Sequence, residues 1–242
     1  FQKLKIYKLY MNSKKYIYCA IDYKDLSQSK KLLDQIHNFI GGIKLGLEFF
    51  VSNGLEGVKI IKKYKLPIFL DLKLHDIPNT VNKAMEAALS VEPHLLSIHI
   101  TSGVPVLKLI TKHKKRTKII GVTMLTSLEA KDLKNIGVEC SINKYVEKLA
   151  KLAYHNGLDG IVCSPKELSL LRNKFPSKFI FVTPGIRLKK NKLNDQKRIL
   201  EPGEAIKKGS NIIVMGRPIT EASKPVDRLK EIMKNIQDHK VN

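Results

Sequence analysis

The segment 69–80 carries charged side chains where a buried strand is expected. Asp71 and Lys73 stand two positions apart, so on a strand their side chains point to the same face. The alternate positions hold Leu70, Leu72 and Leu74, which point to the opposite face. Taking a charge out of water costs several kcal/mol unless it is paired, so packing alone explains this placement poorly. We therefore expect this carboxylate and this ammonium group to do chemistry.

Two more charged residues end neighbouring apolar segments. Lys44 lies in the segment 42–45, and Asp22 directly follows the segment 16–21. Together with Asp71 and Lys73 they place four ionisable groups at the carboxyl ends of three consecutive expected strands. In barrel enzymes the active site is built at this end of the strands.

A second group of residues is suited to binding an anion. Gly216 and Arg217 follow the last expected strand, and Arg187 follows the strand before it. Glycine lets backbone N–H groups approach an anion, and arginine offers a planar fork of donors. Pro218 suits the first turn of a short helix. The segment 185–201 between these strands shows no clear element and is typical of a functional lid.

Short apolar runs rich in β-branched residues alternate with longer amphipathic stretches. Eight such units in a chain of 242 residues predict an α/β fold of the (β/α)8 TIM-barrel type, and an open doubly wound sheet is the alternative. The expected strands are 16–21, 42–45, 68–73, 95–100, 118–125, 160–164, 179–183 and 211–215. The expected helices are 27–38, 47–64, 80–90, 104–114, 142–156, 166–174 and 226–237. We expect a single domain over 11–242 and treat 1–10 as an extension outside it.

Other interpretations of the charged residues remain open. They could form a buried ion-pair network that only closes the barrel mouth, although an apolar plug would be at least as stable. A metal held by Asp22, Asp71, His75 and Asp76 is disfavoured because the interleaved lysines repel a divalent cation. His75, in a turn beside Asp76, is more typical of a hydrogen-bonded structural residue than of a catalytic base.

The composition narrows the class of protein only slightly. Lys and Arg number 44 against 22 Asp and Glu, a net charge of +22, but only six of the 44 are Arg. Nucleic-acid sites favour Arg, so solvated helix faces are the preferred interpretation of the lysines. Three cysteines without CxxC spacing indicate a reducing compartment, and we predict the cytoplasm. No apolar run is long enough for a membrane span, because lysines interrupt each candidate.

The spacing Asp71-x-Lys73-x-x-Asp76-Ile77-x-Asn79-Thr80 resembles the signature of the orotidine 5′-phosphate decarboxylase family, in its stand-alone bacterial form. Further matching blocks occur in the family's order over about residues 16–237. They are 20–22 (AID), 43–46 (IKLG), 121–127 (GVTMLTS), 157–164 (GLDGIVCS), 183–187 (TPGIR), 195–196 (DQ) and 216–218 (GRP).

The resemblance implies a (β/α)8 homodimer that converts orotidine 5′-monophosphate to UMP and CO2, the last step of de novo pyrimidine synthesis, without cofactor or metal. It implies catalytic roles for Lys44, Asp71 and Lys73, with Asp76 supplied by the partner subunit together with Thr80. It implies that Asp22 and Lys44 contact the ribose. It further implies that Thr126 and Ser127 read the pyrimidine, with Gln196 bridging from the lid, and that Arg187, Gly216 and Arg217 hold the phosphate. Ile77 and Pro184 complete the implied substrate-binding set.

Loss of CO2 from C6 of the pyrimidine leaves a carbanion with little resonance help. A lysine ammonium group fixed beside C6 can stabilise that charge and then protonate it, which is the role that the resemblance implies for Lys73. The chain departs from the family in the lid. Arg187 is followed by Leu188-Lys189-Lys190-Asn191-Lys192, where proline and glycine are expected.

Two other functions compete with this interpretation. A decarboxylase of the same barrel superfamily that acts on a sugar phosphate with Mg²⁺ shares the Asp-x-Lys-x-x-Asp core but not 77–80 or 195–196, and sensitivity to a chelator would distinguish it. A basic nucleic-acid-binding protein would need a contiguous Arg and aromatic surface, whereas this chain has no Trp. We therefore predict no nucleic-acid or membrane partner.

Overall fold

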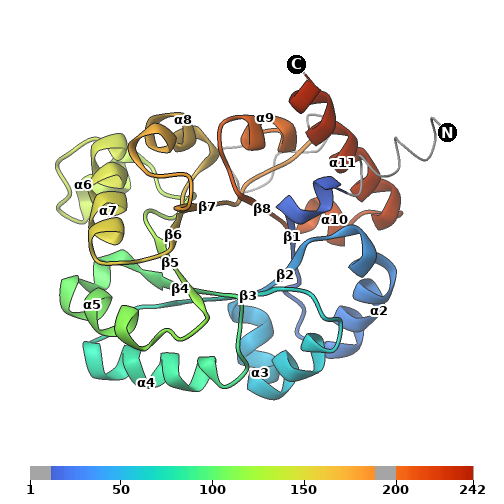
Figure 1. The fold of residues 1–242 in the computed structure, drawn as a ribbon, viewed down its shortest axis with the longest axis horizontal. Coiled ribbons are helices and arrows are strands. Elements are labelled where there is room, and N and C mark those ends of the chain that lie inside the picture. Colours follow the sequence, from blue (N-terminus) through green and yellow to red (C-terminus); the bar gives the residue numbers. More distant parts are fainter. Residues whose placement is uncertain (1–11, 189–199, 242) are drawn as a thin grey trace.

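A computed structural model describes residues 12–188 and 200–241, and within them eight parallel strands close into a barrel (Figure 1). Each strand pairs with the next, and β1 pairs with β8, so the TIM-barrel prediction is confirmed and the open sheet is wrong. The strands are β1 (Ile17–Ala20), β2 (Gly42–Leu45), β3 (Ile68–Leu74), β4 (Leu95–His99), β5 (Lys118–Val122), β6 (Gly160–Val162), β7 (Ile180–Thr183) and β8 (Ile212–Met215).

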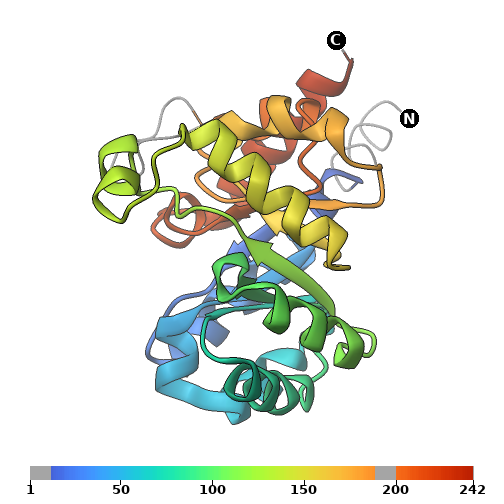
Figure 2. The same ribbon diagram turned by 90° about the vertical axis from the view of Figure 1, so that its left-hand side faces the viewer.

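Helices surround this barrel on the outside (Figures 1 and 2). The longer ones are α2 (Leu26–Ile36), α3 (Leu47–Lys62), α4 (Pro78–Leu89), α5 (Val104–His113), α7 (Ile142–His155) and α11 (Pro225–Val241). All six occupy expected helical ranges. Figure 2 shows α7, in yellow, crossing the side of the barrel that faces the viewer. In the described part of the chain no helix is long and apolar enough to cross a membrane.

The short elements differ from the expectations. Two helices of six residues, α6 (Ala130–Asn135) and α9 (Pro202–Lys207), were not expected, because so few residues show little periodicity. Each begins with a capping box, at Glu129 and at Glu201. The expected helix 166–174 is instead α8 (Leu168–Leu171) between 3-10 turns at Pro165–Glu167 and Arg172–Lys174. The short helix expected at Pro218 is present as α10 (Arg217–Thr220).

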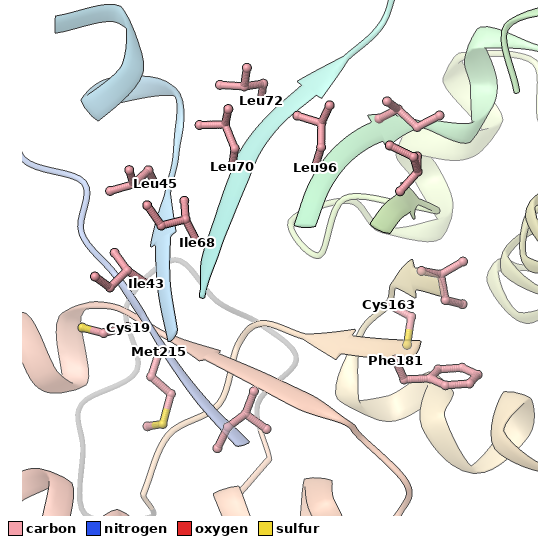
Figure 3. Close-up of a cluster of buried hydrophobic side chains, with 14 of the residues drawn as sticks. Cys19, Ile43, Leu45, Ile68, Leu70, Leu72, Leu96, Cys163, Phe181 and Met215 are labelled. Atoms are coloured by element: carbon pink, nitrogen blue, oxygen red, sulfur yellow. The ribbon is translucent and has the colours of Figure 1, made fainter. Parts of the chain in front are cut away.

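The apolar core forms two layers because successive strand residues alternate between the faces of the sheet. In β3, Leu70 and Leu72 belong to the large layer between the strands and the helices, near Leu45 and Leu96 (Figure 3). The interior of the barrel holds a smaller cluster made of Tyr18, Phe69, Leu95, Ile120, Val182 and Ile212. The β3 residues that follow Phe69 on the inner face are Asp71 and Lys73, which therefore reach the barrel mouth.

The expected boundary at residue 10 lies outside the described residues, as does most of the expected lid, 189–199. The residues at the two ends of the lid segment are described, and they lie in contact with each other. Ile186 and Leu200 form a parallel bridge, and the Arg187 amide donates to the Leu200 carbonyl at 3.1 Å. The segment 185–201 is therefore closed at its base, directly beside the end of β7.

Candidate active site

Four charged side chains from β1, β2 and β3 form one alternating row at the carboxyl ends of these strands. Lys44 Nζ lies 2.8 Å from Asp22 Oδ2 and 3.8 Å from Asp71 Oδ2. Lys73 Nζ lies 2.8 Å from the same Asp71 Oδ2. The side chains of Lys44 and Asp71 are each 10% exposed, and that of Lys73 is 30% exposed. The arrangement predicted from spacing is present, and Lys73 is its most accessible cation.

The charge on Asp71 is stabilised by its neighbours. Burial alone would raise the pKa of this carboxyl group, but the charges of Lys44 and Lys73 and two hydrogen bonds outweigh it, so the pKa lies below its ordinary value. The bonds come from the Lys73 ammonium group and from the hydroxyl of Ser97. Asp71 is therefore ionised at neutral pH although it is buried.

Ser97 was not anticipated. It lies in β4, is fully buried, and donates to Asp71 Oδ1 at 2.7 Å while it accepts from the Lys73 amide at 2.9 Å. The signal in the sequence is a polar residue on the inner face of an otherwise apolar strand, since 95–98 reads Leu-Leu-Ser-Ile. Only the barrel shows that this position faces Asp71.

Asp22 is held by the turn between β2 and α3. Its Oδ1 accepts from the Gly46 amide at 2.9 Å. A Cβ atom at position 46 would lie 2.5 Å from this Oδ1 and 2.6 Å from Lys44 Nζ. The close approach of these two side chains, and not an unusual backbone angle, favours glycine at this position.

A cavity of about 550 Å³ opens beside the charged row. Its lining joins the row to the residues expected to hold an anion, and the predicted residues in it are Asp22, Lys44, Asp71, Pro184, Arg187, Gly216 and Arg217. Arg187 is only 5% exposed. Tyr23, Glu48 and Glu221 also line this cavity and were not anticipated.

A second, smaller cavity of about 180 Å³ shares Lys44, Asp71, Pro184 and Val214 with the first and also contacts Lys73. Its other walls are apolar apart from Thr126, and they comprise Phe69, Val122, Met124, Leu125, Val162 and Val182. The expected fifth strand ends at Val122 and not at residue 125, which frees 124–126 to form this wall. A volume of this size is sufficient for a single small ring beside Lys73.

Some predicted residues lie outside both cavities. Ser127 is exposed and lines neither. Asp76, Ile77 and Thr80 are also exposed, on the turn after β3 and at the start of α4. Asp76 Oδ1 accepts from the Ile77 amide at 2.6 Å and does not join the row within this chain. Gln196 lies outside the described residues.

His75 and a metal site were the remaining possibilities. The ring of His75 packs against that of His99, with centroids 5.2 Å apart, and lines neither cavity. Burial, followed by the charges of His75 and Lys73, lowers the pKa of His99. Over residues 12–188 and 200–241, no group of three or more His, Cys, Asp or Glu side chains could hold a metal ion.

Fold and site together define a TIM-barrel protein whose candidate active site is a Lys-Asp-Lys row that opens onto a cavity lined by two arginines. Residues 15–232 match the orotidine 5′-phosphate decarboxylase / HUMPS family, and the chain belongs to this family. The protein is an enzyme of the decarboxylase class.

Relatives and solved structures agree with this membership. The chain is 46% identical to the orotidine 5′-phosphate decarboxylase of Sphingopyxis alaskensis, over 89% of this chain and 96% of that one. It is 43% identical to the enzyme of the same name from a Wolbachia pipientis strain, over 92% and 99%. The crystal structure of orotidine 5′-phosphate decarboxylase from Lactobacillus acidophilus has a TM-score of 0.80 and 32% identity, covering 91% of this chain and 98% of that chain.

Proposed function

We propose that this protein removes CO2 from orotidine 5′-monophosphate to give UMP, the last step of pyrimidine synthesis. The observation that carries the proposal is the buried Asp71 carboxylate, bonded to Lys73 at 2.8 Å at the edge of a ring-sized cavity. The names of the relatives supply the substrate. We also propose that the protein acts in the cytoplasm, and its three free cysteines support a reducing compartment.

Lys73 is the proposed electrostatic stabiliser and proton donor. The bond between C6 and the carboxylate breaks, its electron pair stays on C6, and CO2 leaves. The Lys73 ammonium group then donates a proton to C6 and is later reprotonated from solvent. Its exposed fraction of 30% leaves it open to the cavity, while the contact with Asp71 directs its ammonium group.

The charge of one lysine does not lower the activation barrier enough to account for a typical enzymatic rate. Two unit charges about 4 Å apart interact by about 4 kcal/mol at an effective dielectric constant near 20. Enzymes lower their barriers by about 8–23 kcal/mol. The rest must come from fixed neighbours such as Asp71 and from binding energy at the ribose and the phosphate.

We assign that remote binding to the large cavity. Asp22 and Lys44 would contact the ribose, and Arg187, Gly216 and Arg217 would hold the phosphate beside the closed base of the lid. Pro184 lies between the two cavities and lines both. Thr126 would read the pyrimidine edge, with Ser127 next to it and Gln196 reaching over from the lid.

We also propose a homodimer with shared sites, in which Asp76 and Thr80 enter the site of the partner subunit and complete its row. Two features support this. Both residues are exposed and absent from the cavities of their own chain. Large apolar side chains are exposed at the same end of the barrel, with Leu47 at 52%, Val51 at 82% and Ile77 at 66%. Apolar surface of this kind marks protein contacts.

A spectrophotometric assay of orotidylate consumption with excess chelator tests the function. We expect turnover that survives the chelator and falls below a few per cent in Lys73→Ala, because the cation beside C6 is lost. The fold should survive, since Lys73 is partly exposed. If the folded, unmodified protein does not consume orotidylate, the proposed function is refuted. Activity of the same protein on a sugar phosphate in the presence of Mg²⁺ would then point to the competing decarboxylase. High activity in Lys73→Ala would refute only the mechanism.

A further inference from the structure

The backbone of β3 is irregular at the catalytic row. Leu70 pairs with Leu96 and Leu74 with Ile98, so three residues of β3 lie opposite the single residue Ser97 of β4. Within this bulge Lys73 has a φ of +50°, in the left-handed region that residues with a Cβ atom rarely adopt. Such a conformation persists only where the surroundings hold it.

The Ser97 hydroxyl makes two hydrogen bonds to residues of this bulge. A hydroxyl can donate one hydrogen bond and accept two, and Ser97 uses both capacities at once. It accepts from the Lys73 amide at 2.9 Å and donates to Asp71 Oδ1 at 2.7 Å. One side chain from the neighbouring strand therefore joins the backbone of the catalytic lysine to the carboxylate that directs its ammonium group.

The two oxygens of Asp71 have separate partners. Oδ1 accepts from Ser97, and Oδ2 faces the lysines, at 2.8 Å from Lys73 Nζ and 3.8 Å from Lys44 Nζ. With the hydroxyl removed, the carboxylate can rotate about its terminal bond and the Lys73 amide loses its side-chain acceptor. Ser97 is fully buried, so bulk water does not replace it.

We infer that Ser97 is a positioning residue for the decarboxylation, which fixes the bulge of β3 and the rotation of Asp71 so that Lys73 points at the reacting carbon. The inference rests on the proposed function. Ser97 does not line either cavity, so it acts through its two neighbours and not on the substrate.

The test compares Ser97→Ala with Ser97→Thr, which keeps the hydroxyl. We expect kcat to fall about 10- to 100-fold in the alanine variant, the effect of losing a hydrogen bond to a charged group, and to recover most of the loss in the threonine variant. KM and the affinity for the product UMP should change less than about threefold, because ribose and phosphate contacts remain. A merely structural role would not separate kcat from UMP affinity in this way.

Thr117→Val is the matched control. Thr117 is 5% exposed, and its hydroxyl donates to the Pro93 carbonyl at 2.8 Å at the opposite end of the barrel. The substitution Thr117→Val also removes one buried hydroxyl group, and we expect it to leave kcat unchanged. A full kcat in Ser97→Ala, or an equal loss in Thr117→Val, would overturn the inference. If Ser97→Ala does not fold, Ser97→Cys repeats the test, because it fills the space but donates weakly.

The unmodified protein and Lys73→Ala in the same assay separate the two proposals. If the unmodified protein is active, Lys73→Ala is inactive and Ser97→Ala is fully active, then only the role of Ser97 is refuted and the proposed function stands. A crystal structure of Ser97→Ala adds a readout that does not depend on turnover. We expect Lys73 Nζ to leave Asp71 Oδ2, and an unchanged position would overturn the inference.

Discussion

Asp71 is the residue through which the charged side chains of the site are connected. Its two oxygens contact Lys44, Lys73 and Ser97, from three different strands. Ionisation of a buried carboxyl group requires such partners, since burial alone favours the neutral form. The same contacts limit how far Lys73 can move, so substitutions here affect the direction of the ammonium group as well as its charge.

The proposed phosphate-binding role of Arg217, at the start of α10, can be tested by a single substitution. Arg217 lines the large cavity beside Gly216. Because its guanidinium group is the proposed partner of the substrate phosphate, we expect Arg217→Ala to reduce kcat/KM about 100-fold or more and to weaken UMP binding in parallel. Steady-state kinetics and calorimetric titration with UMP measure both.

Arg228→Ala is the control for charge. Arg228 lies on α11 and pairs with Glu231 at 2.9 Å, outside both cavities. Its removal also lowers the net charge by one and should leave kcat/KM within about twofold, as expected of an exposed ion pair. A drop in kcat with intact UMP affinity in Arg217→Ala would argue against the phosphate role.

At the scale of elements, the site depends on how each strand ends. β2 passes into α3 at Gly46, whose amide orients Asp22, and β3 ends in a bulge that turns Lys73 into the cavity. β5 ends at Val122, so the chain that follows forms an apolar wall. At the end of a strand the backbone hydrogen bonds to the neighbouring strands stop, and the side chains there can point into the site.

Gly46→Ala tests the turn between β2 and α3. The added Cβ atom would lie 2.5 Å from Asp22 Oδ1 and 2.6 Å from Lys44 Nζ, so the ion pair must shift. We expect kcat/KM to fall about 10- to 100-fold, because an ångström of misplacement at a catalytic site has effects of this size. Kinetics together with thermal unfolding report the change.

Gly54→Ala in the same helix provides the contrast. Gly54 has a φ of +57° and a ψ of −159°, a region that only glycine readily adopts, so alanine is strained there by about 1–3 kcal/mol, but the added carbon meets no atom within 4 Å. This variant should lose stability and keep its kcat. Equal activity losses in both variants would mean that the stability of α3, and not the spacing of Asp22 and Lys44, governs turnover.

At the scale of the whole molecule, one chain presents the charged row but leaves Asp76 and Thr80 exposed outside the two cavities beside it. Leu47 and Val51 near the start of α3, and Ile77 just before α4, are exposed apolar side chains at the same end of the barrel. A second copy that covers this surface would bury the apolar area and bring its own Asp76 toward Lys73. Stability and activity would then depend on protein concentration.

Hybrid dimers test the shared site. Lys73→Ala and Asp76→Ala should each be nearly inactive alone. When they are co-expressed in equal amounts, half the dimers are hybrids with one intact site of two, so we expect about a quarter of the unmodified activity. The rate at saturating orotidylate measures it. Additive, negligible activity in the mixture would show that each chain completes its own site.

The sequence by itself determined the barrel, the order of its strands and the identity of most candidate residues. Strand alternation made Asp71 and Lys73 share a face, and all eight expected strands are present. The barrel and the charged row depend on local periodicity and on spacing, which are readable without knowing what lies nearby. The candidates Thr80, Thr126, Ser127 and Gln196 rest on the family resemblance instead.

The tertiary structure alone decided what surrounds those residues. Ser97 contacts Asp71 across 26 positions, Asp22 meets Gly46 across 24, and the bulge at Lys73 exists only relative to β4. Short helices such as α6 and α9 likewise depend on capping and packing more than on periodicity. Contacts between distant segments follow from the register and curvature of a closed barrel, because closure brings together side chains that no local pattern links.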